Sequence, residues 1–437
     1  MRYRLGTPWA GAGIVLSVLA GAIMVDAQAE WTVTDLGTLG GLYGDAHDIN
    51  DAGHVVGESS VESGDRAFLW TPSGGMVDLG TLGGLRSVAV GINNAGQVVG
   101  FADLASSSQR AFLWTAAGGM IDLGILGELF PGFGFSGASD INELGHVVGV
   151  TSVGGGFEQH AFLWTPSGGM IDLGTLGGPN SSARAINDAG QVVGRSDTAT
   201  GEEHAFIWTA ATGMIDLGTL GGASSGASDI NEAGQVVGRA AMASGDEHAF
   251  LWMAAGGMID LGTLGGEGSR SQAEGINDLG EVVGLFTDND DRGFYWTAAG
   301  GMVELPTLSG VESAARAINN AGQLAGYGDI DTGDAHAVIW TRAGSPPTPE
   351  EQITSLEASV QDLVEGGSLK PGQANGLASP LQNALRSLAR GQLASACAQL
   401  GDFQAEVTRK VADGALTPAE GAALIDSAAR IRTALGC

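Results

Sequence analysis

The sequence predicts an all-β chain, a seven-bladed β-propeller closed by its N-terminal strand, followed by a small C-terminal α-helical bundle. Three observations carry this prediction. A tryptophan recurs at a nearly constant spacing, each repeat holds four short apolar segments, and the segment missing from the last repeat stands ahead of the first. Repeats of about 40–45 residues with four strands each are typical of propeller blades.

The first thirty residues have the pattern of an export signal. Arg2 and Arg4 precede an uncharged run from 10 to 25, and Ala27-Gln28-Ala29 offers small residues where a signal peptidase cleaves. This run of 16 residues is shorter than the ~20 that a membrane-spanning helix needs. We therefore expect residues 1–29 to be removed and the mature protein to be secreted, either extracellular or periplasmic, without insertion into a membrane.

The repeats follow from residue 30 to residue 341. Their tryptophans are spaced 44, 50, 44, 44, 44 and 44 residues apart, at Trp70, Trp114, Trp164, Trp208, Trp252, Trp296 and Trp340. Each repeat reads Ala-x-x-Ile-Asn with a turn, then Gln-Val-Val-Gly, His-Ala-Phe-Leu/Ile-Trp and Gly-Met-Ile-Asp-Leu-Gly-Thr-Leu, with small variations. These segments are rich in β-branched and aromatic residues and are separated by turn residues, so each is expected to be a strand.

The apolar residues of these strands fall on both faces. Successive side chains of a strand point to opposite sides of the sheet, yet neighbours such as Val192 and Val193 are both apolar. Each sheet must therefore be covered on both sides, as it is when blades stack. Residues 31–39 form a lone fourth strand and the repeat at Trp340 lacks one, so the two chain ends are expected to complete one blade and leave no open edge.

The repeated motifs resemble the bacterial extracellular HAF repeat. The resemblance rests on His-Ala-Phe-Leu-Trp, Asp-Leu-Gly-Thr-Leu-Gly-Gly and Ile-Asn-x-x-Gly-x-Val-Val-Gly, and it covers residues 31–341. Three repeats depart by having Arg66, Arg110 or Arg292 at the His position. The resemblance implies an exported repeat protein and brings no established activity.

A Pro-rich linker, residues 342–349, leads into a second module at 350–437. Thr348, Pro349 and Glu351 form a helix start signal, and Thr417, Pro418 and Glu420 repeat it. Apolar residues at helical spacing and glycines at the expected stops predict four helices. The module is similar to the helical FIMAH module that is appended to many secreted bacterial proteins.

The chain has two cysteines, Cys397 and Cys437, both in the helical module. Exported proteins meet oxidising compartments, so these residues are expected to form a disulfide within the module. A disulfide between two chains is the alternative.

Charge narrows the choice of partners. The 437 residues carry a formal charge of −30 and only two lysines, Lys370 and Lys410. Such a balance argues against nucleic acid and anionic membrane surfaces. We found no catalytic constellation: the acidic residues of the fourth strands and the histidines of the third strands recur by blade, which favours structural roles. The sequence therefore predicts that the protein is not an enzyme.

Two features break the repeat symmetry on one face, the one formed by the loops between second and third strands and between blades. A six-residue insertion brings Phe130, Phe133 and Phe135 near Phe157 of the next loop. We expect these aromatic residues to bind a ligand, with a local mini-core as the alternative. The loop containing Asp329, Asp331 and Asp334 has some carboxylate spacing suited to Ca²⁺, but it matches a calcium loop poorly and a solvated hairpin is favoured. No other cofactor is expected.

These observations together predict a secreted scaffold or binding protein that presents one propeller face to a glycan, a cell-envelope component or a protein. An enzyme acting on extracellular polysaccharide and a purely structural matrix protein are the alternatives.

Overall fold

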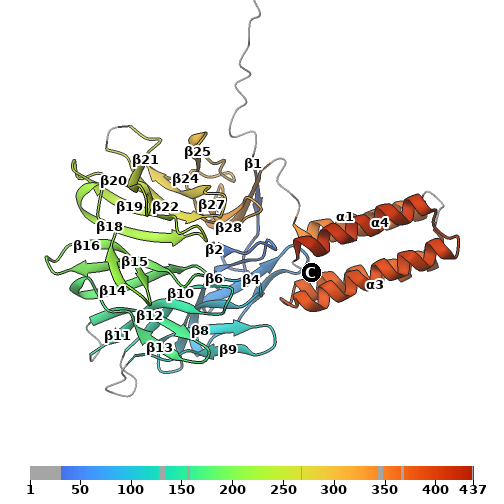
Figure 1. Ribbon diagram of the computed structural model, residues 1–437, viewed down its shortest axis with the longest axis horizontal. Helices are drawn as coiled ribbons and strands as arrows, with labels where there is room; N and C mark the ends of the chain where they lie inside the picture. The colour runs from blue at the N-terminus through green and yellow to red at the C-terminus, as the bar shows by residue number, and fades with distance from the viewer. Residues whose placement is uncertain are drawn as a thin grey trace, which may run out of the picture.

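The protein consists of a β-propeller with a helical module projecting from one side (Figure 1). This computed structural model describes residues 31–126, 134–154, 158–266, 268–342, 348–365, 369–435 and 437, so the expected signal peptide lies outside the described residues. The propeller has seven four-stranded antiparallel sheets. The predicted fold class is confirmed.

The seven sheets are numbered as blades in chain order, each running from an inner to an outer strand. Blades 1 to 3 comprise β2 (Gly44–Ile49), β3 (Val55–Val61), β4 (Gly64–Thr71) and β5 (Gly75–Asp78); β6 (Gly83–Ile92), β7 (Val98–Leu104), β8 (Gln109–Thr115) and β9 (Gly119–Asp122); and β10 (Ser136–Ile141), β11 (Val147–Val153), β12 (Glu158–Thr165) and β13 (Gly169–Asp172). Blades 4 and 5 comprise β14 (Gly177–Ile186), β15 (Val192–Thr198), β16 (Glu203–Thr209) and β17 (Gly213–Asp216); and β18 (Gly221–Ile230), β19 (Val236–Met242), β20 (Glu247–Met253) and β21 (Gly257–Gly262). Blades 6 and 7 comprise β22 (Arg270–Ile276), β23 (Val282–Thr287), β24 (Asp291–Thr297) and β25 (Gly301–Glu304); and β26 (Ser313–Ile318), β27 (Gln323–Asp329), β28 (Ala335–Arg342) and β1 (Trp31–Asp35).

Blade 7 joins the two ends of the propeller. Strand β1 pairs antiparallel with β28, and Val33 lies opposite Trp340. The Trp31 ring meets Tyr295 of blade 6 edge-on, with ring centroids 5.1 Å apart. The N-terminal strand therefore supplies the missing fourth strand, as the sequence predicts.

The core lies between blades. Val193 packs with Ile230 and Phe250 of blade 5, whereas its neighbour Val192 packs with Val148 of blade 3. The same two-sided arrangement recurs around the ring, because each sheet has apolar side chains on both faces. Burial of both faces therefore binds each blade to its two neighbours.

Two rings of hydrogen bonds close the propeller at the face where first and second strands turn, here called the hairpin face. In the first ring each asparagine side chain of Ile-Asn donates to the backbone carbonyl of the equivalent asparagine one blade on, at 2.9 to 3.2 Å, and the last link runs from Asn319 to Asn50. All seven of these asparagines are buried: Asn50, Asn93, Asn142, Asn187, Asn231, Asn277 and Asn319.

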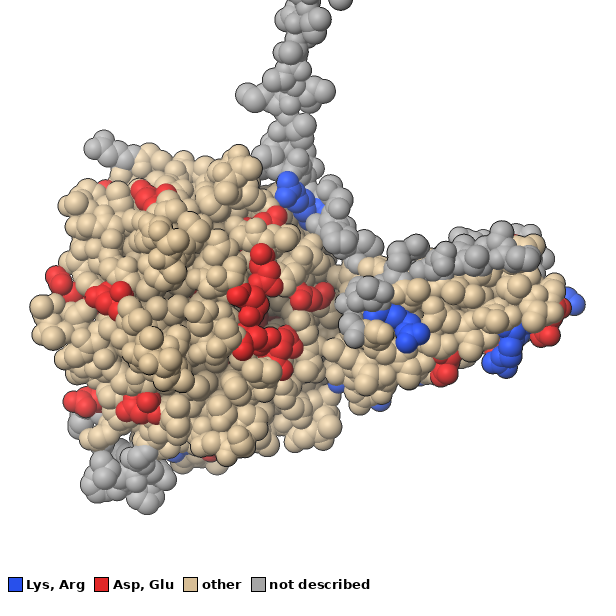
Figure 2. All heavy atoms as spheres, viewed as in Figure 1, with Lys and Arg blue, Asp and Glu red and all other residues tan. Residues whose placement is uncertain are grey.

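In the second ring, the residue after each asparagine donates its backbone N–H to the side-chain oxygen of its counterpart in the next blade, at 2.8 to 3.0 Å. Five of the seven members are carboxylates: Asp51, Glu143, Asp188, Glu232 and Asp278. Figure 2 shows acidic side chains gathered on the propeller beside the helical module.

The helical module is a bundle of four helices. They are α1 (Pro349–Glu365), α2 (Pro371–Leu388), α3 (Leu393–Ala412) and α4 (Pro418–Ala434), and each contacts the next, with α4 returning to α1. The predicted start signal of α4 is present, because Thr417 and Glu420 bond each other's backbone N–H through their side chains. Cys397 and Cys437 form a disulfide within the chain, with their Cα atoms 6.0 Å apart.

The module is seated on the hairpin face. His54, in the first hairpin of blade 1, lies 2.8 Å from Glu350 at the start of α1, and both side chains are buried. Gly391, after α2, lies against Gly96 in the hairpin of blade 2. The opposite mouth of the propeller carries neither of these contacts.

Candidate functional site

Every inner strand of the propeller carries a bulge at the same position. In blade 4 the register with β15 shifts between Ala183 and Ala185, which leaves Arg184 as the extra residue. The glycine of Val-Val-Gly sits opposite, where a Cβ on Gly194 would overlap the Ser182 carbonyl. Bulges re-aim side chains and are frequent beside active sites. The seven bulge residues are His47, Val90, Ser139, Arg184, Ser228, Glu274 and Arg316.

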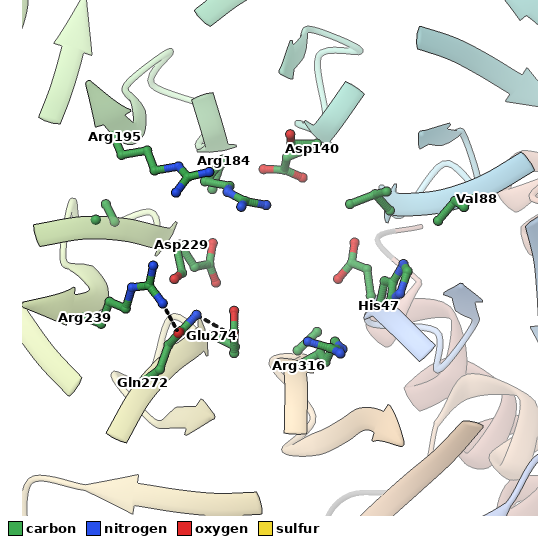
Figure 3. Close-up of a pocket in the computed structure, with 18 of the residues that line it drawn as sticks. His47, Val88, Asp140, Arg184, Arg195, Asp229, Arg239, Gln272, Glu274 and Arg316 are labelled. Carbon is green, nitrogen blue, oxygen red and sulfur yellow. Dashed lines mark hydrogen bonds between the residues drawn. The ribbon is translucent and has the colours of Figure 1, made fainter. Parts of the chain in front are cut away.

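All seven bulge residues line one cavity of about 520 Å³ on the propeller axis (Figure 3). The inner strands run toward the hairpin face, and each ends on an isoleucine. The cavity is lined by residues that precede these isoleucines, so it lies on their side away from the hairpin face. The opposite face of the propeller, formed by the loops between second and third strands and between blades, is here called the variable face. A second hollow of about 200 Å³ lies at the hairpin-face end of the axis. It is lined by isoleucines that end the inner strands and by members of the two hydrogen-bond rings.

Three aspartates line the cavity next to the bulges, in blades 1, 3 and 5. Asp229 accepts backbone N–H bonds from Ile230 of its own blade at 2.7 Å and from Ile276 of the next blade at 2.8 Å. Asp48 and Asp140 bridge blades 1 to 2 and 3 to 4 in the same way. The alternate blades hold only glycine or alanine at this position: Gly91, Ala185, Gly275 and Ala317.

Burial changes the protonation of these three carboxyls. It raises the pKa of Asp229 to about 7 and that of Asp48 to about 6, although the two amide bonds of each favour the charged form. Burial, with the charge of Asp48 second, raises the pKa of Asp140 well above its ordinary value. Near neutral pH the carboxyls of Asp229 and Asp48 are therefore able both to accept and to donate a proton.

Arginines occupy the wall of blades 4 and 5. Arg184, Arg195 and Arg239 all line the cavity, and Arg184 and Arg195 extend side by side in Figure 3. Burial and the neighbouring charge of Arg195 lower the pKa of the Arg184 guanidinium. With Arg316, four of the 17 arginines in this acidic chain line one cavity.

Arg316 has an acidic partner of its own. Its guanidinium binds Asp45 of blade 1 through Nε at 3.1 Å and a terminal nitrogen at 2.8 Å, which also links blades 7 and 1. Burial alone would raise the pKa of Asp45, but His47 and Arg316 hold it below its usual value. This pair is a fixed part of the wall.

Glu274 and an apolar patch complete the lining. Glu274 accepts a hydrogen bond of 2.7 Å from Gln272, whose oxygen accepts one of 3.1 Å from Arg239. Burial raises the pKa of Glu274 against the opposing charges of Arg316, Arg184 and Arg239. Blade 2 contributes Val88, Val90 and Phe101, so one sector of the cavity is apolar, whereas all the charged lining residues belong to the other blades.

Most of the phenylalanine site predicted from the sequence lies outside the residues that the structure describes. Phe130, Phe133 and Phe157 lie outside the described residues. Phe135 is partly buried, and its backbone N–H donates to Ser152 at 2.9 Å. Binding at this loop stays a prediction.

The three aspartates of the calcium prediction lie in or beside the hairpin of β27 and β28. Asp329 is the last residue of β27, the backbone N–H of Asp331 donates to Ser309, and Asp334 accepts from Thr332 at 2.7 Å. In the part of the chain that the structure describes, no group of three or more His, Cys, Asp or Glu side chains has an arrangement suited to a metal ion. Calcium binding at this loop stays a prediction.

The repeated histidines and outer-strand acids pair with each other. Four histidine–aspartate pairs have Nδ1 to oxygen distances of 2.8 to 2.9 Å: His160–Asp172, His204–Asp216, His248–Asp260 and His336–Asp35. In blade 6 Arg292 replaces the histidine and bonds Glu304 at 3.2 Å. Mutual pairing explains both repeated positions without a ligand.

The axial residues were not predicted from the sequence. Some of them occupy the two variable places of Ala-x-x-Ile-Asn. Others occupy the place directly after Val-Val-Gly, which holds Glu58, Phe101, Arg195 and Arg239. The strands of the repeats are otherwise similar from blade to blade, so variation at these places was a usable signal. Its meaning becomes clear only once the bulge shows where these side chains point.

Comparison with known protein families identifies the helical module. Residues 353–433 match the FIMAH domain family. A search of curated protein sequences finds no match to the chain. The resemblance of the propeller to HAF repeats stays a prediction.

Solved structures with a similar fold are propellers of low sequence identity. TolB from Acinetobacter baumannii is 12% identical with a TM-score of 0.42, over 61% of this chain and 64% of that one. A puromycin hydrolase is 12% identical with a TM-score of 0.47, over 67% and 52%. The six-bladed Aleuria aurantia fucose lectin is 9% identical with a TM-score of 0.33, over 67% and 92%. The chain thus spans about two thirds of the TolB chain and half of the hydrolase, and these similarities show the fold alone.

The expectation that the protein is not an enzyme is wrong as a deduction from the sequence. A hydrolase is among the structures of similar fold, so the propeller class does not separate binding proteins from enzymes. The prediction also rested on the outer-strand acids and the third-strand histidines, and not on the axial carboxyls Asp48 and Asp229, whose pKa values burial raises to about 6 and about 7.

None of the helices in the described ranges is long and apolar enough to cross a bilayer.

Proposed function

We propose that this is an exported binding protein whose propeller takes a polar, hydroxyl-rich ligand, such as a segment of a glycan, in the axial cavity. One observation carries the proposal. The bulge of every blade directs one side chain into the same cavity, and these seven residues are five different amino acids in an otherwise uniform repeat. A purely structural repeat would have no reason to diversify there.

The size and chemistry of the cavity support this proposal. Its volume of about 520 Å³ falls within the ~300–1,000 Å³ of small-ligand sites. Guanidinium donors and carboxylate acceptors face a common space, and sugar hydroxyls can both donate to and accept from such groups. The apolar sector at Phe101 offers a surface for the C–H face of a sugar ring.

Filling the cavity tests the proposal. Gly226 lines it, and a Cβ there would meet only Arg195 at ordinary contact distances, so Gly226→Phe occupies the cavity without backbone strain. Ser106→Phe adds the same ring to an exposed loop on the variable face and serves as control. On a glycan array, Gly226→Phe should lose the signals that the wild type and Ser106→Phe retain. Equal binding by all three proteins would contradict the proposal.

A second candidate function is acid–base catalysis on an extracellular polysaccharide. It is favoured by Asp229, whose pKa of about 7 matches a general acid or base at neutral pH. If it operates, glycans that bind should yield new reducing ends on incubation, and Asp229→Ala should abolish their release while the protein still binds. Release of no new ends from any bound glycan would exclude it.

A further inference from the structure

We infer that the ligand of the axial cavity carries a carboxylate, as uronic-acid glycans do, and that Arg184 with its neighbours Arg195 and Arg239 holds that carboxylate. This inference rests on the proposed function, because it names the class of ligand for the same cavity.

The side chain of Arg184 is the first observation that supports this inference. Its side chain is accessible from the cavity that it lines, yet in the described ranges it takes part in no hydrogen bond and no ion pair. After burial, the charge of Arg195 has the largest effect on the pKa of Arg184 and lowers it, and Glu274 opposes it more weakly. A guanidinium presents a planar fork of donors that matches a carboxylate, so an unpaired one facing a cavity is a receptor for an anion.

The two neighbouring arginines add charge without being fully neutralised. Arg195 lies 3.3 Å from Glu203, and both side chains are about 38–39% exposed, which makes this a weak surface pair. The carboxylate of Glu247 lies 4.0 Å from Arg239, at the limit of an ion pair, and Arg239 donates a hydrogen bond to the neutral amide of Gln272. The wall of blades 4 and 5 therefore keeps a positive character.

The fourth cavity arginine does not compete for this role. Arg316 is held by Asp45 through two nitrogens, so its fork is already occupied. The positive pole is thus confined to one side of the cavity, and Figure 3 shows Arg184 and Arg195 on the side away from His47.

The acidic residues of the cavity favour a single negative charge over a double one. Asp140, Asp229 and Glu274 line the same space and would repel a dianion such as a phosphate ester. Their oxygens can instead accept hydrogen bonds from hydroxyls beside the bound carboxylate. A sugar acid supplies both groups at once.

Calorimetric titration with trigalacturonate, and with the same trisaccharide after its carboxyls are reduced to alcohols, tests the inference. Arg184→Gln removes the charge and the fork, and Arg184→Lys keeps the charge alone. Arg270→Gln is the matched control, since Arg270 is an exposed residue of the inner strand of blade 6 and does not line the cavity. Melting temperatures verify that each variant is folded.

We expect trigalacturonate to bind and the reduced trisaccharide to bind at least about tenfold more weakly. Arg184→Gln should weaken trigalacturonate binding by about 10- to 100-fold, as expected for loss of hydrogen bonds to a charged group. Arg184→Lys should lose less, and Arg270→Gln should match the wild type.

Equal binding of the two trisaccharides, or an Arg184→Gln variant that binds trigalacturonate normally, would overturn the inference. The inference would also be overturned if sulfated oligosaccharides were the only ones to bind on the glycan array. If neutral oligosaccharides still bind and Gly226→Phe abolishes their binding, the proposed function stands without the carboxylate. If binding survives Gly226→Phe, the proposed function fails as well.

Discussion

At the scale of residues, the propeller axis shows how one position can be structural in some blades and chemical in others. Asp48, Asp140 and Asp229 each hold two backbone amides and thereby join blades in pairs. Glycine or alanine in the remaining blades leaves room for them: a Cβ on Gly91 would lie 3.1 Å from the Cα of Asp140. The same carboxyls face the cavity, so their structural bonds also orient them toward a ligand.

The pKa of Asp229 links this position to folding. It is about 7 in the folded protein, against about 3.9 for an aspartate in an unfolded chain. Between about pH 4 and pH 7 the folded state retains a proton that the unfolded chain has released. The contribution of Asp229 to the free energy of unfolding therefore falls as pH rises through this window and is constant above it.

Urea unfolding of the wild type and Asp229→Ala at pH 5 and pH 8 measures this linkage. Alanine is the residue that blades 4 and 7 carry at the equivalent position. The wild type should lose more stability between the two pH values than the variant does. Equal losses would show that Asp229 titrates in the folded protein as it does in the unfolded chain.

At the scale of elements, the hairpin between first and second strands does more than turn the chain. The asparagine that starts each turn bonds its own loop and also the next blade, as Asn231 does through Gln235 and Asn277. From the sequence these asparagines are expected to form turns, and they do. The bond across blades was not foreseeable, because it joins residues about 44 positions apart through a closed ring.

Asn231→Ala should lower the free energy of unfolding by about 2–4 kcal/mol, because it leaves buried backbone groups without partners. Glu232→Gln is the control: it is exposed and keeps the oxygen that accepts the Asp188 amide, so it should be nearly neutral. Chemical denaturation of both variants measures the difference. Losses of similar size would mean that the buried ring has no special part in stability.

At the scale of the whole molecule, the propeller depends on a strand from the opposite end of the chain. Strand β1 covers the edge of β28, and Trp31 is buried against blade 6. Deletion of residues 31–39 should leave that edge open and cause aggregation or a lower melting temperature. Light scattering with calorimetry measures both, and a truncated protein that remains monomeric with unchanged melting would contradict the closure of the ring.

The architecture was predictable and the cavity was not, for a physical reason. The apolar periodicity and the displaced N-terminal strand can both be seen in the linear sequence. They were therefore enough to predict the blades and the closure of the ring. The cavity arises where seven bulges meet, and a bulge depends on pairing between strands. Asp229 and Arg184 therefore looked like unremarkable positions inside a repeated motif, whereas the phenylalanines near residue 130 were conspicuous.

The proposed ligand site lies on the propeller axis. A crystal structure of the protein with an oligosaccharide selected on the glycan array would locate the bound sugar. The predicted result is density for the sugar inside the cavity, in contact with Arg184 and with the carboxyl of Asp229 or Glu274. Density at the loop of Phe133 and Phe135, with the axial cavity holding only solvent, would contradict the claim and return the site to the variable loops.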